Sequence, residues 1–369
     1  MDGQGTYYLE ICDPDGTRRA MLDDFWDLSY RREVNNSGWL RFSCDGQHSK
    51  LALLQKNSQL RVYRRDPVNN VPWYEDFVGI YRKRRFETPD YDRFSADCPG
   101  AMWLINWRVN SYKAETSNRS RFSNVSVERL GKTLLQYNCT SLATTGNGRL
   151  RNGNFTGVFT LVVATDQNRG PVVSRDNSGV RLLKELSELA QAYGGDWGIT
   201  RTGPAQWTIE YYPGQLGQDV SATVEFSLEN DNMGEPHYEE DTTEEKTIAI
   251  VAGPDQAQKR QMRVRTSPVW SASNDIEVWV DARNEQQGGN AALDTAGDKA
   301  LRENRLKQEF GFTAKTSPAT VLHRDFDLGY LVTARYRNLV TVTQKVWAIT
   351  TTYDAKTGKE EIEPELGDP

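Results

Sequence analysis

The feature that most constrains the fold of this chain is an unbroken β-type run near its C-terminus. Leu339 to Tyr353 consists largely of Val, Thr, Ile, Trp and Tyr. At about 3.3 Å per residue, such a run would reach ~50 Å, well beyond the ~17–20 Å of an ordinary strand. A strand this long must bend, break or cross an assembly. The sequence Asp354–Gly358 that follows predicts a hairpin turn, with Gly358 in the left-handed conformation.

Alternating strand patterns fill both ends of the chain, and a different texture separates them. In the middle, apolar residues at helical spacing predict helices over 126–138 and Leu182–Tyr193, and Gly194-Gly195 ends the second. Trp197 to Tyr211 reads as a strand–turn–strand unit. We therefore expect a mainly β protein with an α+β insertion.

Three domains follow from this pattern. Residues 1–112 and 236–369 are predicted to form β-sheet domains, which the family resemblance given below implies to be barrels or sandwiches, and residues 113–235 form the α+β insertion between them. The C-terminal domain is expected to carry one polar helix over 295–310, with an apolar edge of Leu301, Leu306 and Phe310.

Composition narrows the function classes. The chain has 369 residues with 45 Lys and Arg against 51 Asp and Glu, a net charge of −6, which argues against a general nucleic-acid binder. No apolar run approaches the ~18 residues of a membrane span, and the N-terminus has no signal-peptide pattern, so a soluble protein made in the cytoplasm is expected. The four cysteines contain no CxxC pair and are predicted to be buried thiols. They are Cys12, Cys44, Cys98 and Cys139.

A catalytic constellation is not found. His48, His237 and His323 lie in different regions, and no phosphate-loop, nucleophile-elbow or dinucleotide motif occurs. The sequence therefore predicts no catalytic, cofactor-binding or metal-binding residue, and no enzyme. One alternative stays open, a glycan- or cell-wall hydrolase or a carbohydrate-binding module, because paired carboxylates need only be close in space. The candidates, by residue type alone, are Asp231, Glu239, Glu240 and Asp241.

Two runs of charged residues, one acidic and one basic, each allow a binding role or a purely structural role. Glu225–Glu245 holds nine acidic residues and no Lys or Arg, which fits a site for a cation or a basic partner, or a solvated linker paired with arginines elsewhere. The basic run Arg82–Arg85 lies between aromatic residues, as in nucleic-acid grooves. On a strand, however, Arg82 and Arg84 face one way and Lys83 and Arg85 the other. Acidic residues flank the run, so we favour a charge-paired strand at an interface.

Three stretches carry a resemblance to a known family. Trp73–Ile80 looks like the first-barrel strand of the tail hub proteins of long-tailed bacteriophages, which include baseplate hubs. Ile276–Arg283 is similar to the strand that precedes the family's polar helix. Asp325–Val332, Val340–Tyr353 and Glu361–Gly367 resemble its closing barrel.

The resemblance implies a structural virion protein without a cofactor. The two β-rich domains would correspond to two tail-tube barrels in one chain, so that a homotrimer matches the sixfold tail tube. The hub would lie at the tail tip or baseplate. It would join the distal tail or tube protein to the tip or fibre proteins used in host attachment. The tape measure protein is a further possible partner. Genome DNA would pass through its channel in transit, and no stable membrane insertion is implied.

Overall fold

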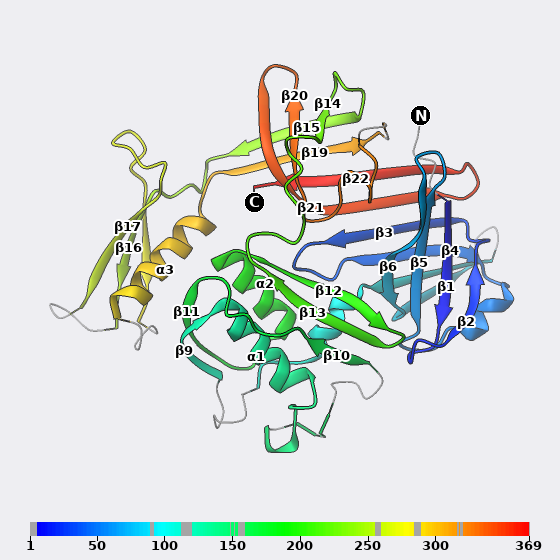
Figure 1. Cartoon of the computed structure of the whole chain (residues 1–369), viewed down its shortest axis with the longest axis horizontal. Helices are drawn as coiled ribbons and strands as arrows, with labels where there is room; N and C mark the ends of the chain where they lie inside the picture. Colours follow the sequence, from blue (N-terminus) through cyan, green and yellow to red (C-terminus); the bar gives the residue numbers. More distant parts are fainter. Residues whose placement is uncertain are drawn as a thin grey trace.

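The computed structural model describes residues 6–88, 92–111, 120–147, 149–150, 152–153, 159–254, 260–283, 289–315, 317 and 320–368. Figure 1 shows strands as the dominant elements, with helices in the middle of the chain and near one end of the molecule. None of the helices in these ranges is long and apolar enough to span a membrane.

The elements fall into three stretches along the chain, of which the first contains strands and no α-helix. The N-terminal elements are β1 (Thr6–Cys12), β2 (Arg18–Leu22), β3 (Asp27–Glu33), β4 (Trp39–Asp45), β5 (Gln59–Asp66), β6 (Val71–Ile80), β7 (Lys83–Glu87) and β8 (Arg93–Pro99). The middle elements are β9 (Ser120–Ser126), α1 (Val127–Cys139), β10 (Thr160–Val163), β11 (Val172–Asn177), α2 (Leu182–Tyr193), β12 (Asp196–Gly203) and β13 (Gln206–Tyr212). The C-terminal elements are β14 (Glu225–Ser227), β15 (Met233–Asp241), β16 (Ile248–Ala252), β17 (Met262–Thr266), β18 (Glu277–Asp281), α3 (Gly289–Glu303), β19 (Lys307–Ala314), β20 (Leu331–Tyr336), β21 (Val340–Asp354) and β22 (Lys359–Gly367). Short 3-10 turns cover Ser49–Leu53, Ala101–Trp107 and Thr145–Asn147.

A ten-stranded sheet forms the centre of the molecule and joins the two ends of the chain. Its main path runs β15-β19-β22-β21-β3-β4-β8-β7, and β20 and β14 are attached beside β21. The N-terminal and C-terminal halves meet where β21 pairs with β3, from Ala348 opposite Glu33 to Asp354 opposite Asp27. The 15-residue β21 can be this long because its first part pairs with β20 and its last part with β3, while β22 follows most of its other edge.

A second, four-stranded sheet covers part of this sheet. Its order is β2-β1-β5-β6, and Figure 1 shows its strands crossing those of the central sheet at a steep angle. Apolar side chains of both sheets form one core, including Leu9, Leu28, Phe42 and Val62. The contact also buries an ion pair, because Arg64 of β5 binds Glu360 of β22 through two hydrogen bonds of 2.8 and 3.0 Å.

The middle region has its own core. The helices α1 and α2 pack with the sheet β10-β13-β12, burying Leu130, Leu186, Trp197 and Trp207. A buried polar contact fixes this region to the central sheet, since Lys345 of β21 lies 2.6 Å from Asp196 at the start of β12. Both side chains are almost fully buried.

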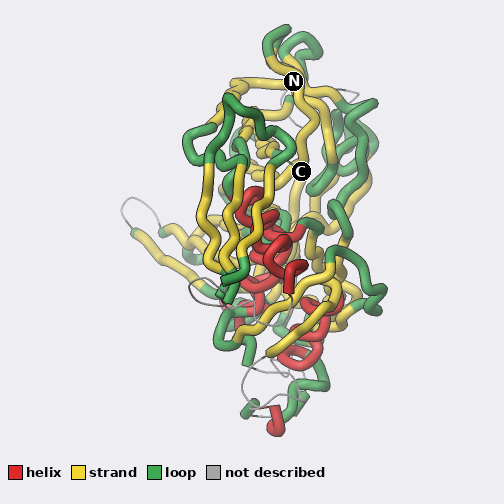
Figure 2. The backbone as a smooth tube through the Cα atoms, turned by 90° about the vertical axis from the view of Figure 1, so that its left-hand side faces the viewer, coloured by secondary structure: helices red, strands yellow, loops and turns green. Residues whose placement is uncertain are grey.

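A small lobe projects at one end of the molecule. It consists of the sheet β17-β16-β18 and α3, whose Leu293 and Leu301 pack on Ala249 and Val251. Figure 2 views this end and shows the three strands in front with the helix behind them, so the uncovered face of the sheet points outward. Val264 and Trp279 on this face are exposed.

Several sequence-based expectations are confirmed. The fold is mainly β with several sheets, although the strands of the described residues form open sheets and no closed barrel. The helices expected over 126–138 and Leu182–Tyr193 are α1 and α2, and Gly194 ends α2 with a φ of 79°. The long run is β21, with Gly358 at a φ of 69° in its hairpin. The four cysteines are free and buried.

Two expectations were wrong: the C-terminal end of the polar helix and the linker interpretation of the acidic stretch. The polar helix predicted over 295–310 ends at Glu303, because Lys307–Ala314 forms β19, held between β15 and β22, with Phe310 in the core. The acidic stretch is not a linker, since its residues Met233–Asp241 form β15. β15 also crosses the predicted domain boundary between residues 235 and 236, and the three-domain division stays a prediction.

Candidate assembly surface

The three histidines are scattered over the molecule. His48 contacts Asp24, His237 lies on β15 near Glu309, and His323 contacts Asp327 and stacks on Tyr74. Within the described part of the chain, no group of three or more His, Cys, Asp and Glu is placed to hold a metal ion.

The carboxylates proposed for hydrolysis do not resemble an acid–base pair. Lys315 lowers the pKa of Asp231, and hydrogen bonds from Thr243 lower the pKa of Asp241. A general acid for glycoside cleavage needs the opposite shift. Glu239 and Glu240 are neighbours on a strand, so their side chains point to opposite faces of the sheet.

The largest organised polar feature is one whole face of the central sheet. Along each pair of strands, residues directly opposite each other lie on the same face, so the register identifies its members. One face is apolar and packs into the cores, with Leu28 opposite Phe42. The other face, here called the polar face, carries Asp27 opposite Ser43, and Arg41 opposite Asp97.

Carboxylates outnumber basic side chains on the polar face. Its paired acidic residues are Asp27, Glu33, Asp45, Glu87, Asp97, Glu239, Asp241, Glu309, Asp354, Glu361, Glu363 and Glu365. Along the eight-strand path its paired basic residues, apart from His237, are Arg31, Arg41, Lys83, Arg85, Arg93, Lys307, Lys345 and Lys359. The excess of acid lies mainly on the strands of the C-terminal half.

Ion pairs tie neighbouring strands together across this face. Arg31 of β3 reaches over β21 to bind Glu365 of β22, with Nη2 2.6 Å from Oε2, and it also contacts Glu33. The two hydrogen bonds to Glu365 and the contact with Glu33 raise the pKa of Arg31. Arg93 donates a 2.8 Å hydrogen bond to Asp27. The polar face is therefore preformed, and it faces solvent except near Lys345, which Asp196 of the middle region helps to bury.

The two edges of the sheet carry opposite charge. The path ends at β7, with the sequence Lys83-Arg84-Arg85-Phe86-Glu87, and every residue of this strand is exposed. At the other end lies β15, whose last five residues are His237-Tyr238-Glu239-Glu240-Asp241. Lys83 and Arg85 lie on the polar face and Arg84 on the other, as the alternation predicted. Arg82 precedes the strand and lies over Trp103 and Trp107.

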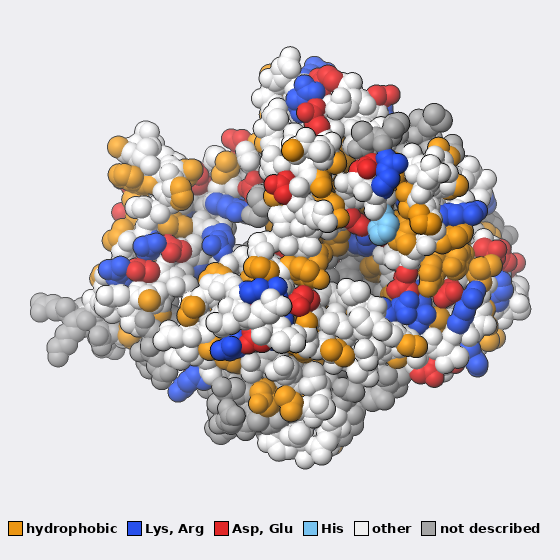
Figure 3. All heavy atoms as spheres, in the orientation of Figure 1, with side chains coloured by type: hydrophobic (Ala, Val, Ile, Leu, Met, Phe, Trp, Pro, Cys, Tyr) orange, Lys and Arg blue, Asp and Glu red, His pale blue; other side chains and the backbone are white. Residues whose placement is uncertain are grey.

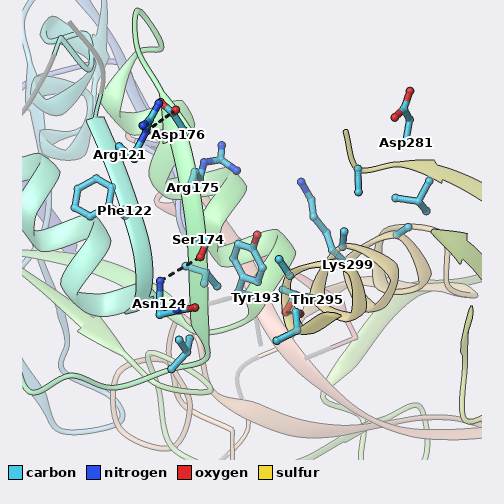
Figure 4. Close-up of a pocket in the computed structure, with 18 of the residues that line it drawn as sticks. Arg121, Phe122, Asn124, Ser174, Arg175, Asp176, Tyr193, Asp281, Thr295 and Lys299 are labelled. Carbon is cyan, nitrogen blue, oxygen red and sulfur yellow. Dashed lines mark hydrogen bonds and ion pairs between the residues drawn. The ribbon is translucent and has the colours of Figure 1, made fainter. Parts of the chain in front are cut away.

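A groove separates the lobe from the middle region. It has a volume of about 760 Å³ and lies between β9 and β11 on one side and α3 on the other. Figure 4 shows Arg121 and Asp176 on the first side and Thr295 and Lys299 on the second. Arg121 and Asp176 pair with each other at 3.1 Å, so this wall is already charge-compensated.

An aromatic cluster is exposed on the four-stranded sheet. Tyr8 stacks on Tyr63 with ring centres 4.8 Å apart, Trp73 packs edge-on against Tyr8, and Arg65 lies over Trp73. Figure 3 shows hydrophobic side chains gathered over this sheet, at the right of the view, with Lys and Arg side chains around them. The cluster is a second surface suited to protein contacts.

The fold is that of phage tail proteins. A tail protein from Neisseria meningitidis MC58 has a TM-score of 0.59 at 10% identity and covers 98% of this chain and 97% of its own. The 43 kDa tail protein of prophage MuSo2 from Shewanella oneidensis has a TM-score of 0.58 at 10% identity, covering 99% and 97%. The Francisella PdpA–VgrG complex contains a chain with a TM-score of 0.54 at 10% identity, covering 99% of this chain and 52% of that one.

The family model described as "Siphovirus ReqiPepy6 Gp37-like protein" matches residues 8–368, so the chain belongs to this family. No match is found among the curated proteins. The chain is therefore a member of a siphovirus protein family, and its fold is that of solved phage tail proteins. The resemblance to phage tail proteins stated from the sequence is thereby confirmed.

Sequence reasoning missed the polar face as a unit. Its members come from eight strands that are spread over residues 27–367, and only the register brings them together. Alternation within single strands was the available signal, as in Glu361, Glu363 and Glu365 of β22, which alternate with buried residues.

Proposed function

We propose that this protein is the homotrimeric hub at the distal end of a phage tail, joining the sixfold tail tube to tip or fibre proteins. The observation that carries the proposal is the open eight-strand path with one polar face. Four of its neighbouring strands, β3, β4, β8 and β7, come from the N-terminal part of the chain. The other four, β15, β19, β22 and β21, come from the C-terminal part.

This division into four and four supports the idea of two tube-like units in one chain, 1–112 and 236–369, separated by the insertion 113–235. Three copies would then present six similar four-strand units to a sixfold tube. Twenty-four strands spaced about 4.8 Å apart close a circle of about 115 Å, roughly 37 Å across at the backbone. After side chains are allowed for, this leaves room for a DNA duplex.

The polar face is suited to line such a channel. It carries an excess of carboxylates, so it would repel the phosphate backbone and not retain DNA in transit. The opposite face is apolar and already covered by the four-stranded sheet and the cores. Only one face of the sheet is therefore free to surround a water-filled lumen.

The test is a reconstruction of assembled tails or of reconstituted tail tips, combined with native mass spectrometry of the purified chain. We expect three copies around an open axis with Asp97 and Glu363 facing the lumen. A single copy per tail, or a polar face turned to the outside, would refute the proposal.

A further inference from the structure

We infer that the contact between copies is made by the sheet edges themselves. In this contact, β7 of one copy adds antiparallel to β15 of the next copy, with Lys83 opposite Asp241 and Arg85 opposite Glu239. The inference rests on the ring proposed above and specifies which surfaces close it.

The first argument is the open edge at each end of the path. Within the described ranges, β7 pairs only with β8 and β15 only with β19. An edge strand presents a row of backbone N–H and C=O groups that can template pairing with another chain. A ring of copies would satisfy both rows at once.

The second argument is strand direction. All neighbours along the eight-strand path are antiparallel, so direction alternates and β7 and β15 run in opposite directions. Rotation about an axis roughly parallel to the strands leaves these directions unchanged. The β7 strand of one copy therefore meets the β15 strand of the next in an antiparallel orientation, with both polar faces on the same side.

The third argument is the match of side chains in one register. A bulge in β15 lies between Gly234 and His237, which leaves the regular five-residue segment His237–Asp241, as long as β7 itself. When the two segments are aligned antiparallel over their full length, every opposed pair is complementary. The pairs are Lys83–Asp241, Arg84–Glu240, Arg85–Glu239, Phe86–Tyr238 and Glu87–His237.

The faces also agree. Lys83, Arg85 and Glu87 lie on the polar face of their copy, as do His237, Glu239 and Asp241. Arg84 and Phe86 lie on the other face together with Glu240 and Tyr238. A shift of two residues in one direction would place Glu87 opposite Glu239, and a shift in the other direction would place Arg85 opposite His237, so the charges favour one register.

The charges within one copy leave this contact available. Glu239 is directly opposite Glu309 on β19, a like-charge pair that an arginine from the neighbouring copy would relieve. The present partners of the basic edge are exposed and weak, with Lys83 3.4 Å from Asp97 and Arg85 3.5 Å from Glu87. Phe86 is 56% exposed, and pairing with Tyr238 would cover it.

Charged edges also occur simply as protection against aggregation. Protection alone does not require opposite signs on the two edges or a pairwise match. Opposite signs block β7–β7 and β15–β15 contacts by repulsion while permitting β7–β15 contacts. The pattern thus selects a head-to-tail ring over a twofold dimer.

The test uses the full chain with Arg85→Cys and Glu239→Cys together, oxidised at concentrations spanning the monomer–oligomer range. The native cysteines are buried, so the new thiols react selectively. We expect a covalent trimer on a denaturing gel. The matched control combines Arg84→Cys with Glu239→Cys, which lie on opposite faces and should not cross-link.

Charge reversal gives a second readout. Lys83→Glu with Arg85→Glu should weaken trimer formation roughly a hundredfold, and adding Glu239→Lys with Asp241→Lys should restore it. Lys184→Glu on the exposed surface of α2 is the control and should leave association unchanged.

The outcomes separate the contact from the function. A trimer that neither cross-links at these positions nor responds to charge reversal would overturn the edge contact and leave the hub proposal standing. Cross-linking in the control pair would overturn the register. A chain that remains monomeric in solution and is present as one copy in assembled tails would count against both.

Discussion

The ion pair between Arg64 and Glu360 gives the most direct test of how the N-terminal sheet is fixed to the central sheet. The two side chains are 1% and 0% exposed, and they share two hydrogen bonds of 2.8 and 3.0 Å. The hydroxyl of Tyr7 also donates to Glu360. Glu360→Gln keeps the shape of the side chain but removes its charge, so the Arg64 guanidinium stays buried without its main partner.

The expected cost follows from this geometry. Removing one partner of a buried ion pair usually costs about 3–5 kcal/mol, because it leaves an uncompensated buried charge. Asp66 lies 3.9 Å from Arg64 and compensates part of that charge, so we expect the lower end of the range, about 3 kcal/mol. Such a change multiplies the unfolding equilibrium constant by about 150.

The assay is urea unfolding followed by tryptophan fluorescence and far-UV circular dichroism. The multi-sheet chain is expected to unfold in more than one transition, so the change is assigned to the transition in which the four-stranded sheet separates. Glu363→Gln is the matched control, because Glu363 lies on the same strand but on the exposed polar face, and it should change stability by less than about 0.5 kcal/mol.

A double variant then isolates the cause. Arg64→Met combined with Glu360→Gln removes the unpaired charge and should be more stable than Glu360→Gln alone. If Glu360→Gln unfolds at the same urea concentration as the wild type, or if the double variant gains nothing, the buried charge does not hold the two sheets together.

Three further predictions concern the middle region and the cysteines. Burial raises the pKa of Glu128, but hydrogen bonds from Arg169 and Lys132 outweigh this effect and lower the pKa to about 2. The ionised carboxylate therefore stabilises the folded chain fully above about pH 4.5, and this stabilisation, about 3 kcal/mol, is lost as the pH falls towards 2. Acid titration of Glu128→Gln should lack this loss. Gly131→Ala places a Cβ 2.4 Å from the Trp197 ring, so it should destabilise the chain by about 1–3 kcal/mol in thermal unfolding despite the better helix propensity of Ala. The buried thiols should not react with a thiol reagent until the chain unfolds, since burial raises the pKa of each; immediate labelling of any of them would contradict their placement. They are Cys12, Cys44, Cys98 and Cys139.

Much of the secondary structure was predictable because its signals are local. The stripe of apolar residues from Leu182 to Tyr193 and the glycine after it define α2 without any reference to the rest of the chain. The β-branched run that becomes β21 is similarly clear, although its partners are not. Local signals failed at Phe310, whose spacing suited a helix although pairing with β15 and β22 places it in a strand, and at Leu306, which lies in the connection before that strand.

The buried charges were beyond local reasoning. Lys345 lies in a strand of mostly apolar and Thr residues, and nothing near it in sequence indicates that it donates a hydrogen bond to Asp196, about 150 positions away. Asn35 illustrates the same limit, since it donates to Asp196 and accepts from the backbone of Trp197 in a left-handed conformation. Such contacts join separate regions and are visible only once the fold brings those regions together.

The two charged runs show how the fold changes the meaning of a sequence pattern. Taken separately, Arg82–Arg85 suggests nucleic acid and Glu225–Glu245 suggests a cation or a linker. The sheet order places part of each run, in β7 and in β15, at its two open edges, where their charges are complementary. In the proposed ring, a basic strand that would attract DNA in isolation would be neutralised by the acidic strand of the next copy. The same pairing would leave the carboxylate-rich polar face to determine the charge of the proposed channel, as a conduit for DNA requires.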